Sequence, residues 1–202
     1  VMGKSSHNDG RLFVISGPSG AGKGTLVAVV RNQRPGLGLT VSATTRSPRP
    51  GEVDGTSYHF LTESDFADRL ARGEFLEWAS VHGHRYGTLR SEVDERVAAG
   101  RSVILEIDVQ GALNVRRVYP DAVLIFIEPP SMEALEQRLR ARGTEDESSL
   151  ALRLSNARHE MELADKYDAR VVNDDLDVAA GELSGLLEAF ETNGGDSYNG
   201  SH

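Results

Sequence analysis

The strongest constraint on this chain is a glycine-rich segment at residues 17–25, which reads Gly-Pro-Ser-Gly-Ala-Gly-Lys-Gly-Thr. It lies between an apolar run at residues 12–15 and a helix-like pattern that begins at Leu26, so it predicts the loop of a strand–loop–helix unit. Glycines let such a loop curl around an anionic oxygen with its N–H groups pointing inward, while the helix start and Lys23 add positive charge. The alternative is a turn that only connects strand to helix. The candidate polyphosphate ligands are Gly17, Pro18, Ser19, Gly20, Ala21, Gly22, Lys23, Gly24 and Thr25.

The loop departs from the usual phosphate-loop pattern at one position. The pattern expects Ser or Thr after the lysine, and this chain has Gly24, with Thr25 one step later. A glycine offers no hydroxyl to Mg²⁺. Either Thr25 binds the ion, or nucleotide oxygens, water and a carboxylate elsewhere hold it.

Bulk composition excludes several classes of protein. A chain of 202 residues with 39% hydrophobic content can bury a core as one compact unit. Its net charge of −9 argues against non-specific binding to nucleic acid or to an anionic membrane. With no cysteine, disulfides, thiolate zinc sites and cysteine nucleophiles are excluded. No apolar run reaches membrane-spanning length and the first ten residues are polar, so a cytoplasmic protein is expected.

Strand-like and helix-like patterns alternate along most of the chain. Continuous apolar runs at residues 102–108 and 122–127 are typical of buried parallel strands, and helical patterns surround them. Residues 43–90 differ, since a proline-rich and glycine-rich loop leads into short strands, a short helix and a hairpin. The sequence therefore predicts an α/β fold with a doubly wound parallel sheet, opened by a phosphate loop, and a small mixed α+β insertion. One further strand is expected at residues 39–42.

The loop that opens this insertion carries Arg46 and Arg49, held by neighbouring prolines. Two guanidinium groups at this spacing offer the bidentate donors that suit a phosphate monoester, and the hydroxyls of Tyr58 and Tyr86 can add to them. The alternative is a solvated basic loop.

A carboxylate stands among aromatic residues at Glu77, in the first strand of the expected hairpin. Guanine presents two donors that match a carboxylate, N1–H and the 2-amino group, whereas adenine does not. Ser42 and Thr88 can donate to the guanine O6. The alternative is that Glu77 points out of the ribbon into solvent.

Two further groups of charged residues follow. Glu106 and Asp108 lie at the carboxyl end of a buried strand, where they can hold Mg²⁺ or its waters, although Asp108 can instead cap the next helix. Arg138, Arg142, Arg153 and Arg158 lie in late helical segments that suit a lid over a transferred phosphoryl group. Surface pairing with Glu133, Glu136 or Glu162 is the alternative for each arginine.

Together, the segments at residues 17–25, 42–49, 55–60, 105–111 and 140–145 resemble the guanylate kinase family in order and spacing. The resemblance covers about residues 11–190. It implies a core at residues 11–42, 91–135 and 165–191, a GMP-binding insertion at 43–90 and a lid at 136–164, with tails at 1–10 and 192–202 that are expected to be disordered. The implied reaction is ATP + GMP → ADP + GDP with Mg²⁺. ATP and GMP are the expected partners, with dGMP as a further acceptor. Nucleic acid, membrane and an obligate protein partner are not expected.

The resemblance also implies a role for each matching residue. The guanine would meet Ser42, Glu77, Thr88 and Asp108, and the GMP phosphate would meet Arg46, Arg49, Tyr58 and Tyr86. Lys23 and the loop amides would bind the ATP phosphates, Asn173 and Arg142 would border the adenine, and Arg138, Arg142 and Arg153 would surround the transferred group. The resemblance assigns Asp108 to the guanine instead of the metal. Glu106 and Thr25 remain as metal candidates, although many relatives carry Asp at the position of Glu106. Two rival functions are a non-catalytic phosphopeptide-binding module of the same family and a kinase of another small phosphate ester.

Overall fold

A computed structural model of the chain describes residues 10–81, 83–141 and 147–192. Its helices and strands are β1 (Leu12–Ser16), α1 (Lys23–Gln33), β2 (Gly38–Leu39), β3 (Ala43–Thr44), β4 (His59–Phe60), α2 (Glu63–Ala71), β5 (Phe75–Val81), β6 (His84–Leu89), α3 (Arg90–Ala98), β7 (Val103–Glu106), α4 (Val109–Val118), β8 (Val123–Glu128), α5 (Met132–Ala141), α6 (Glu147–Glu162), the 3₁₀ helix η1 (Ala164–Lys166), β9 (Ala169–Val172) and α7 (Leu176–Thr192).

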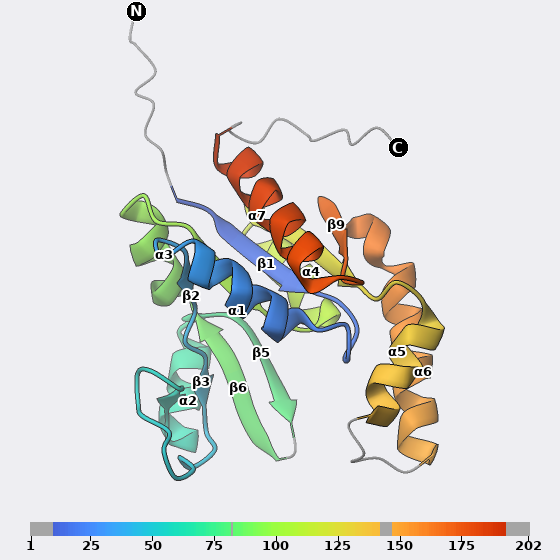
Figure 1. The fold of residues 1–202 in the computed structure, drawn as a ribbon. Coiled ribbons are helices and arrows are strands. Elements are labelled where there is room, and N and C mark those ends of the chain that lie inside the picture. The colour runs from blue at the N-terminus through green and yellow to red at the C-terminus, as the bar shows by residue number, and fades with distance from the viewer. Residues whose placement is uncertain (1–9, 82, 142–146, 193–202) are drawn as a thin grey trace, which may run out of the picture.

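The main sheet is parallel and has the strand order β2-β7-β1-β8-β9. The helices α1 and α7 cover one face, and α3 and α4 cover the other. In Figure 1, α1 and α7 lie in front of β1. The predicted α/β class with a helix-covered parallel sheet is confirmed.

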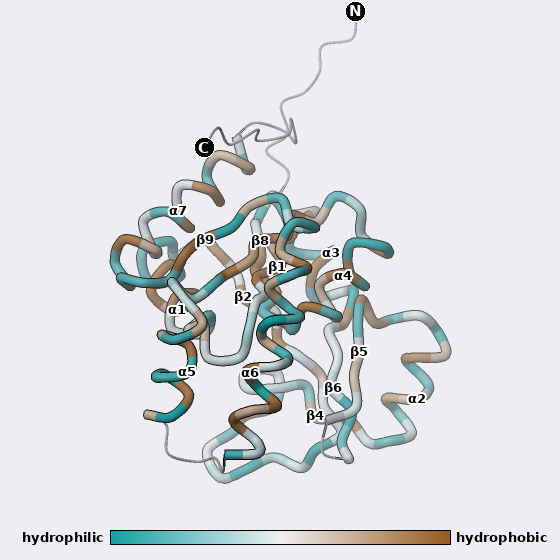
Figure 2. Tube along the Cα trace, turned by 90° about the vertical axis from the view of Figure 1, so that its right-hand side faces the viewer, coloured by the Kyte–Doolittle hydropathy of each residue, from teal (hydrophilic) through white to brown (hydrophobic). Residues whose placement is uncertain are grey.

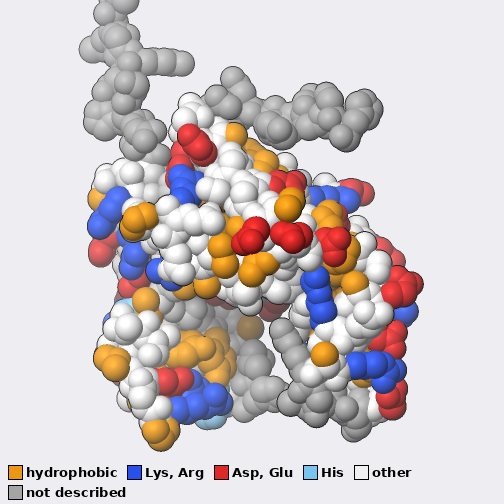
Figure 3. All heavy atoms as spheres, in the orientation of Figure 1, with side chains coloured by type: hydrophobic (Ala, Val, Ile, Leu, Met, Phe, Trp, Pro, Cys, Tyr) orange, Lys and Arg blue, Asp and Glu red, His pale blue; other side chains and the backbone are white. Residues whose placement is uncertain are grey.

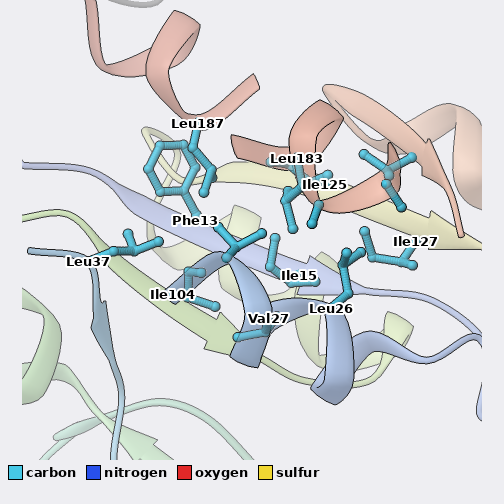
Figure 4. Close-up of a cluster of buried hydrophobic side chains, with 14 of the residues drawn as sticks. Phe13, Ile15, Leu26, Val27, Leu37, Ile104, Ile125, Ile127, Leu183 and Leu187 are labelled. Atoms are coloured by element: carbon cyan, nitrogen blue, oxygen red, sulfur yellow. The ribbon is translucent and has the colours of Figure 1, made fainter. Parts of the chain in front are cut away.

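Alternation along β1 explains why both faces of this sheet are buried. Phe13 and Ile15 point toward α1 and α7, where they pack with Leu26 and Leu187 (Figure 4). The residues between them face the layer formed by α3 and α4. Every residue of β1 is buried, and Figure 2 shows hydrophobic residues concentrated on the central strands β1 and β8. This core anchors the loop that leaves the end of β1.

A second, mixed sheet has the order β4-β3-β6-β5 and lies beside α2. The rings of Phe66 and Phe75 stack there with centroids 4.3 Å apart, over Ala43 and Leu89. The pairing of β5 with β6 shifts register between Phe75 and Glu77, which marks a β-bulge at Leu76. The Leu76 side chain packs into the main core beside α3 and α4 rather than into the aromatic cluster. The bulge therefore joins the two sheets.

The strand expected at residues 39–42 is the main difference from the sequence prediction. Residues 38–39 form the edge strand β2, and Thr40 N still donates to Ile104 O of β7 at 3.0 Å. Ser42 O already accepts from His59 N of the second sheet at 2.9 Å. The prediction was wrong because these residues cross from one sheet to the other instead of pairing along one strand.

The structure also shows two helix caps and the residues at both ends of the described chain. Thr62 and Ser131 act as the expected helix caps, since each side-chain oxygen accepts from a backbone N–H three residues later. Gly10 and Thr192, assigned above to the tails, are placed: Gly10 N donates to Val97 O at 3.3 Å, and Thr192 ends α7. Residues 1–9 and 193–202 lie outside the described residues. No helix in the described ranges is long and apolar enough to cross a membrane.

Candidate functional site

The loop between β1 and α1 is curled by glycines and bridged by its lysine. Gly17, Gly20 and Gly22 have positive φ angles of 141°, 97° and 88°, a region that glycine enters without steric cost. Lys23 is the first residue of α1, and its Nζ donates to Gly17 O at 2.6 Å and to Pro18 O at 3.0 Å. The ammonium group is therefore held across the mouth of the loop, where an anion would bind.

Side chains from the C-terminal half of the chain support this loop. Asn173, just after β9, donates from Nδ2 to Ala21 O at 2.7 Å. A Cβ at Gly22 would lie 2.5 Å from that same Nδ2, so the close approach requires glycine there. Arg138 of α5 donates to Asn173 O at 2.8 Å, and Arg153 of α6 donates to Ser19 Oγ at 3.0 Å. Two of the three arginines predicted around the transferred group thus meet the loop or its support, and Arg142 lies outside the described residues.

A carboxylate lies beside the start of α1. Glu106, the last residue of β7, places Oε1 3.5 Å from where a Cβ of Gly24 would be. Desolvation by the surrounding protein raises the pKa of Glu106, and the Lys23 ammonium opposes that rise. Thr25 follows in the first turn of α1 with an exposed side chain. Among the residues that the structure describes, no group of three or more His, Asp or Glu side chains could by itself hold a metal ion.

The guanidinium of Arg46 is enclosed on the second sheet. Its side chain is 12% exposed and donates from Nη2 to Glu52 Oε1 at 2.8 Å and from Nη1 to Ser47 O at 2.7 Å. It also lies over the Tyr58 ring, 5.4 Å from the centroid. Its interactions with Glu52 and with Tyr86 raise the pKa of Arg46. The solvated-loop alternative therefore does not describe Arg46.

The second arginine of this loop is held differently. The backbone N of Arg49 donates to Glu52 Oε2 at 2.7 Å, while the residue itself is exposed. One Glu52 carboxylate thus ties both arginine positions together. The bonds from Arg46 and from the Arg49 backbone lower the pKa of Glu52. The rings of Tyr58 and Tyr86 meet edge to face at 6.0 Å beside Arg46, so three of the four residues predicted at the acceptor phosphate lie together.

Glu77 turns inward from β5. It pairs with Thr88 of β6, whose Oγ1 donates to Glu77 Oε1 at 2.8 Å. Burial raises the pKa of Glu77; the Thr88 hydrogen bond opposes the rise, and the nearby charge of Asp108 adds to it. Asp108 caps α4, because its Oδ1 accepts from Gly111 N at 2.7 Å. The solvent-facing alternative for Glu77 is therefore wrong. The helix-cap alternative for Asp108 is confirmed; the cap uses only Oδ1, so Oδ2 can still accept another hydrogen bond.

One residue that the sequence analysis did not single out links the two halves of the site. Burial raises the pKa of Glu160 on α6, with Lys23 opposing the rise and Asp108 adding to it. Asp108 also acts on Glu77. The phosphate loop and the inward carboxylate of the second sheet thus belong to one electrostatic neighbourhood. No local pattern marks Glu160, because only the packing of α6 brings it there.

Figure 3 shows the molecule hollowed between the second sheet and the α5–α6 pair.

A parallel α/β sheet whose first strand runs into a lysine-bridged, glycine-curled loop at a helix start defines a P-loop nucleotide-binding protein. Comparison with known proteins narrows this class. The profile of the family described as "Guanylate kinase" matches residues 9–190. The chain belongs to the guanylate kinase family.

Individual relatives cover nearly the whole chain. Guanylate kinase of Gloeobacter violaceus is 51% identical over 183 residues, which are 91% of this chain and 89% of that protein. Guanylate kinase of Synechocystis sp. is 49% identical over 178 residues, 88% and 93% of the two chains. A crystal structure of guanylate kinase from Anaplasma phagocytophilum has a TM-score of 0.70 at 32% identity, and the match covers 92% of this chain and 88% of that one.

Proposed function

We propose that this protein transfers the γ-phosphoryl group of ATP to GMP, giving ADP and GDP. The observation that carries this function is the inward Glu77 carboxylate, held by Thr88 on the second sheet, in a chain whose phosphate loop is bridged by Lys23. Curated relatives at about half identity are named guanylate kinase, which favours catalysis over the phosphopeptide-binding alternative. In this proposal residues 43–90 bind GMP, 136–164 act as the lid, and the rest of 11–191 forms the core of a cytoplasmic enzyme.

The ATP side consists of the loop and the arginines around it. Lys23 and the loop amides would hold the β- and γ-phosphates. Arg138 and Arg153, which already contact Asn173 and Ser19, would neutralise charge on the transferred group. The family resemblance assigns Arg142 to the transferred group as well. It also assigns Arg142 and Asn173 to the edge of the adenine.

The GMP side lies on the second sheet. Arg46, Arg49, Tyr58 and Tyr86 would bind the phosphate, and Glu77 would accept the two donors of the guanine edge. Ser42, Thr88 and Asp108 complete the proposed guanine contacts. An adenine in this position would leave the desolvated Glu77 carboxylate without matching donors, which is costly.

Magnesium fits the residues beside the loop. Glu106 offers a hard oxygen donor near Gly24, and Thr25 offers a hydroxyl one residue later. With so few protein donors, Mg²⁺ would bind mainly through ATP oxygens and water, with Glu106 holding the water shell. When bound, it would neutralise part of the negative charge on the phosphates.

Catalysis in this scheme is positioning plus charge neutralisation. A GMP phosphate oxygen is already nucleophilic, so neither a general base nor a covalent intermediate is required. Lys23 and the arginines would lower repulsion between the two anionic substrates, and closure of α5–α6 over the hollow would exclude water that could otherwise hydrolyse ATP.

The test of this function is a coupled assay for ADP with a panel of acceptors: GMP, dGMP, AMP, CMP, UMP and sugar phosphates. We expect GMP to be the preferred acceptor, with dGMP also used. Turnover of a sugar phosphate in preference to GMP would favour the rival kinase. Measured ATP binding without any turnover would favour the binding module.

Glu77→Gln is expected to raise the KM for GMP about tenfold or more and to narrow the preference for GMP over AMP, because a neutral amide no longer complements both guanine donors. Since burial raises the pKa of Glu77, the carboxylate takes up a proton at a higher pH than an ordinary glutamate. The KM of the parent protein for GMP should therefore rise as the pH falls through that raised pKa. The second ionisation of the GMP phosphate affects parent and variant alike, so the ratio of their KM values is the measurement. An equal pH profile in both proteins would contradict the guanine role.

Glu52→Gln is expected to raise the KM for GMP about fivefold to tenfold with a smaller change in kcat, because it removes the charge that orients Arg46 and braces the Arg49 backbone. The matched control is Glu74→Gln, whose carboxylate pairs with Arg72 and Arg69 near the same sheet. The control should change KM less than twofold. Equal effects of the two variants would show that the loss is a general one of charge or stability.

A further inference from the structure

The edge of the main sheet carries a recess whose chemistry the phosphoryl-transfer site does not use. It has a volume of 320 Å³ and is lined by Arg31, Pro35, Gly36, Leu37, Gly38, Leu39, Arg96 and Arg101. We call this set the arginine recess. It holds three guanidinium groups, and none of its described lining residues is acidic, in a chain of net charge −9. Figure 3 shows several Lys and Arg side chains at the left of the view, with Asp and Glu side chains between them.

The arginines of the recess are poorly neutralised. The Nε of Arg31 is buried and has no hydrogen-bond acceptor among the described residues. In the described part of the chain no carboxylate pairs with Arg31 or Arg101, and Arg96 reaches only Glu92, at 3.3 Å. That Glu92 carboxylate is shared with His59 Nε2, 2.8 Å away. A buried donor without an acceptor is costly unless a ligand or water supplies one.

A neighbouring recess provides the contrast. It has a volume of 400 Å³, shares Pro35, Gly36, Leu37 and Arg101 with the first, and includes Arg34 and Glu191 among its other lining residues. Arg34 donates to Glu191 Oε2 at 2.5 Å and to Ser184 O at 3.3 Å. The protein therefore neutralises Arg34 with Glu191 in the neighbouring recess, whereas Arg31 and Arg101 have no carboxylate partner among the described residues and Arg96 has only the shared Glu92.

The helix ends at this edge do not cancel the positive charge. Arg31 and Arg96 lie in the last turns of α1 and α3, where helix carbonyls favour cations. Each helix end contributes only about half an elementary negative charge. Three guanidinium groups outweigh these partial charges together with the shared Glu92 carboxylate, so a net positive potential remains.

From these observations we propose that the arginine recess is a second anion site, which binds a small molecule carrying a pyrophosphate or another pair of phosphate groups. Guanidinium forks match phosphate oxygens bidentately. The volume equals that of about ten water molecules, more than a single phosphate needs. The site is separate from the phosphate loop, because Arg31 follows Lys23 by eight residues, or about 12 Å along the axis of α1. Its occupancy is independent of the proposed reaction.

Side-chain NMR of the full chain tests this with pyrophosphate as the probe. The Arg Nε–H signals are assigned by substitution, Arg31→Gln and Arg34→Gln each removing one signal. We expect the Arg31 signal to shift saturably on titration, whatever happens at the phosphate loop. Arg101 is exposed, so Arg101→Gln should keep the fold. It should raise the Kd for pyrophosphate, measured from the Arg31 signal, about tenfold. Arg34→Gln, whose arginine is already paired, should change it less than twofold.

Two results would overturn the proposal. One is an Arg31 signal that does not move while signals of the phosphate loop do, which would place all pyrophosphate at Lys23. The other is an equal weakening by Arg34→Gln and Arg101→Gln, which would mean that the anion responds only to net charge.

Discussion

Replacing Lys23 by alanine is expected to lower kcat about a thousandfold or more while leaving GMP binding measurable. The ammonium group is held over the loop by Gly17 O and Pro18 O, 2.6 and 3.0 Å away, where the phosphates of ATP would displace those contacts. Loss of a preorganised positive charge at a developing anion removes transition-state stabilisation. The proposed acceptor side lies on the other sheet, whose Arg46 is held by Glu52 and not by the loop.

The measurement is a coupled assay for ADP beside a separate titration with a fluorescent GMP analogue. The matched control is Lys166→Ala, an exposed lysine of η1, which should leave both quantities within about twofold. A Lys23→Ala protein that still turns over at a comparable rate would refute the assignment of the loop.

Gly17→Ala is expected to lower the free energy of unfolding by about 3 kcal/mol or more. Gly17 has φ 141°, and a Cβ there would lie 2.0 Å from Ile127 O, a backbone atom of the neighbouring strand β8. The clash cannot be relieved by rotating a side chain, so β1 or the loop must move. Urea unfolding followed by circular dichroism measures the change.

The control for this substitution is Gly185→Ala, in α7, where no atom lies within 4 Å of the added Cβ. It should raise stability by up to about 1 kcal/mol, because alanine favours helix more than glycine does. If the two variants lost stability equally, the close approach of β8 to Gly17 would not be the cause.

Several features could be predicted from sequence because they depend on neighbours along the chain. The loop at residues 17–25, the caps at Thr62 and Ser131, and the hairpin containing Glu77 and Thr88 are local patterns. Buried parallel strands were recognisable for the same reason, since β7 and β8 are apolar almost throughout. The family resemblance added residue roles that stay predictions until variants are assayed.

Other features depend on residues that are distant in the chain. The sequence analysis did not single out Glu52, because its bond to Arg46 forms only when the loop folds back on itself. Glu160 approaches Lys23 and Asp108 only through the packing of α6. The strand expected at residues 39–42 failed because two sheets compete for the same short segment.

The amino-acid sequence by itself thus determined that a phosphate loop follows the first strand of a parallel sheet. It also determined that an insertion carries Arg46, Arg49 and the Glu77 carboxylate. It left the direction of Glu77 open, since alternation along a regular strand allows either face. Only the tertiary structure decided it. The bulge at Leu76 sends that side chain into the main core and brings Glu77 opposite Thr88, because the apolar surface buried by Leu76 stabilises this register and the hydrogen bond from Thr88 partly offsets the desolvation of the carboxylate.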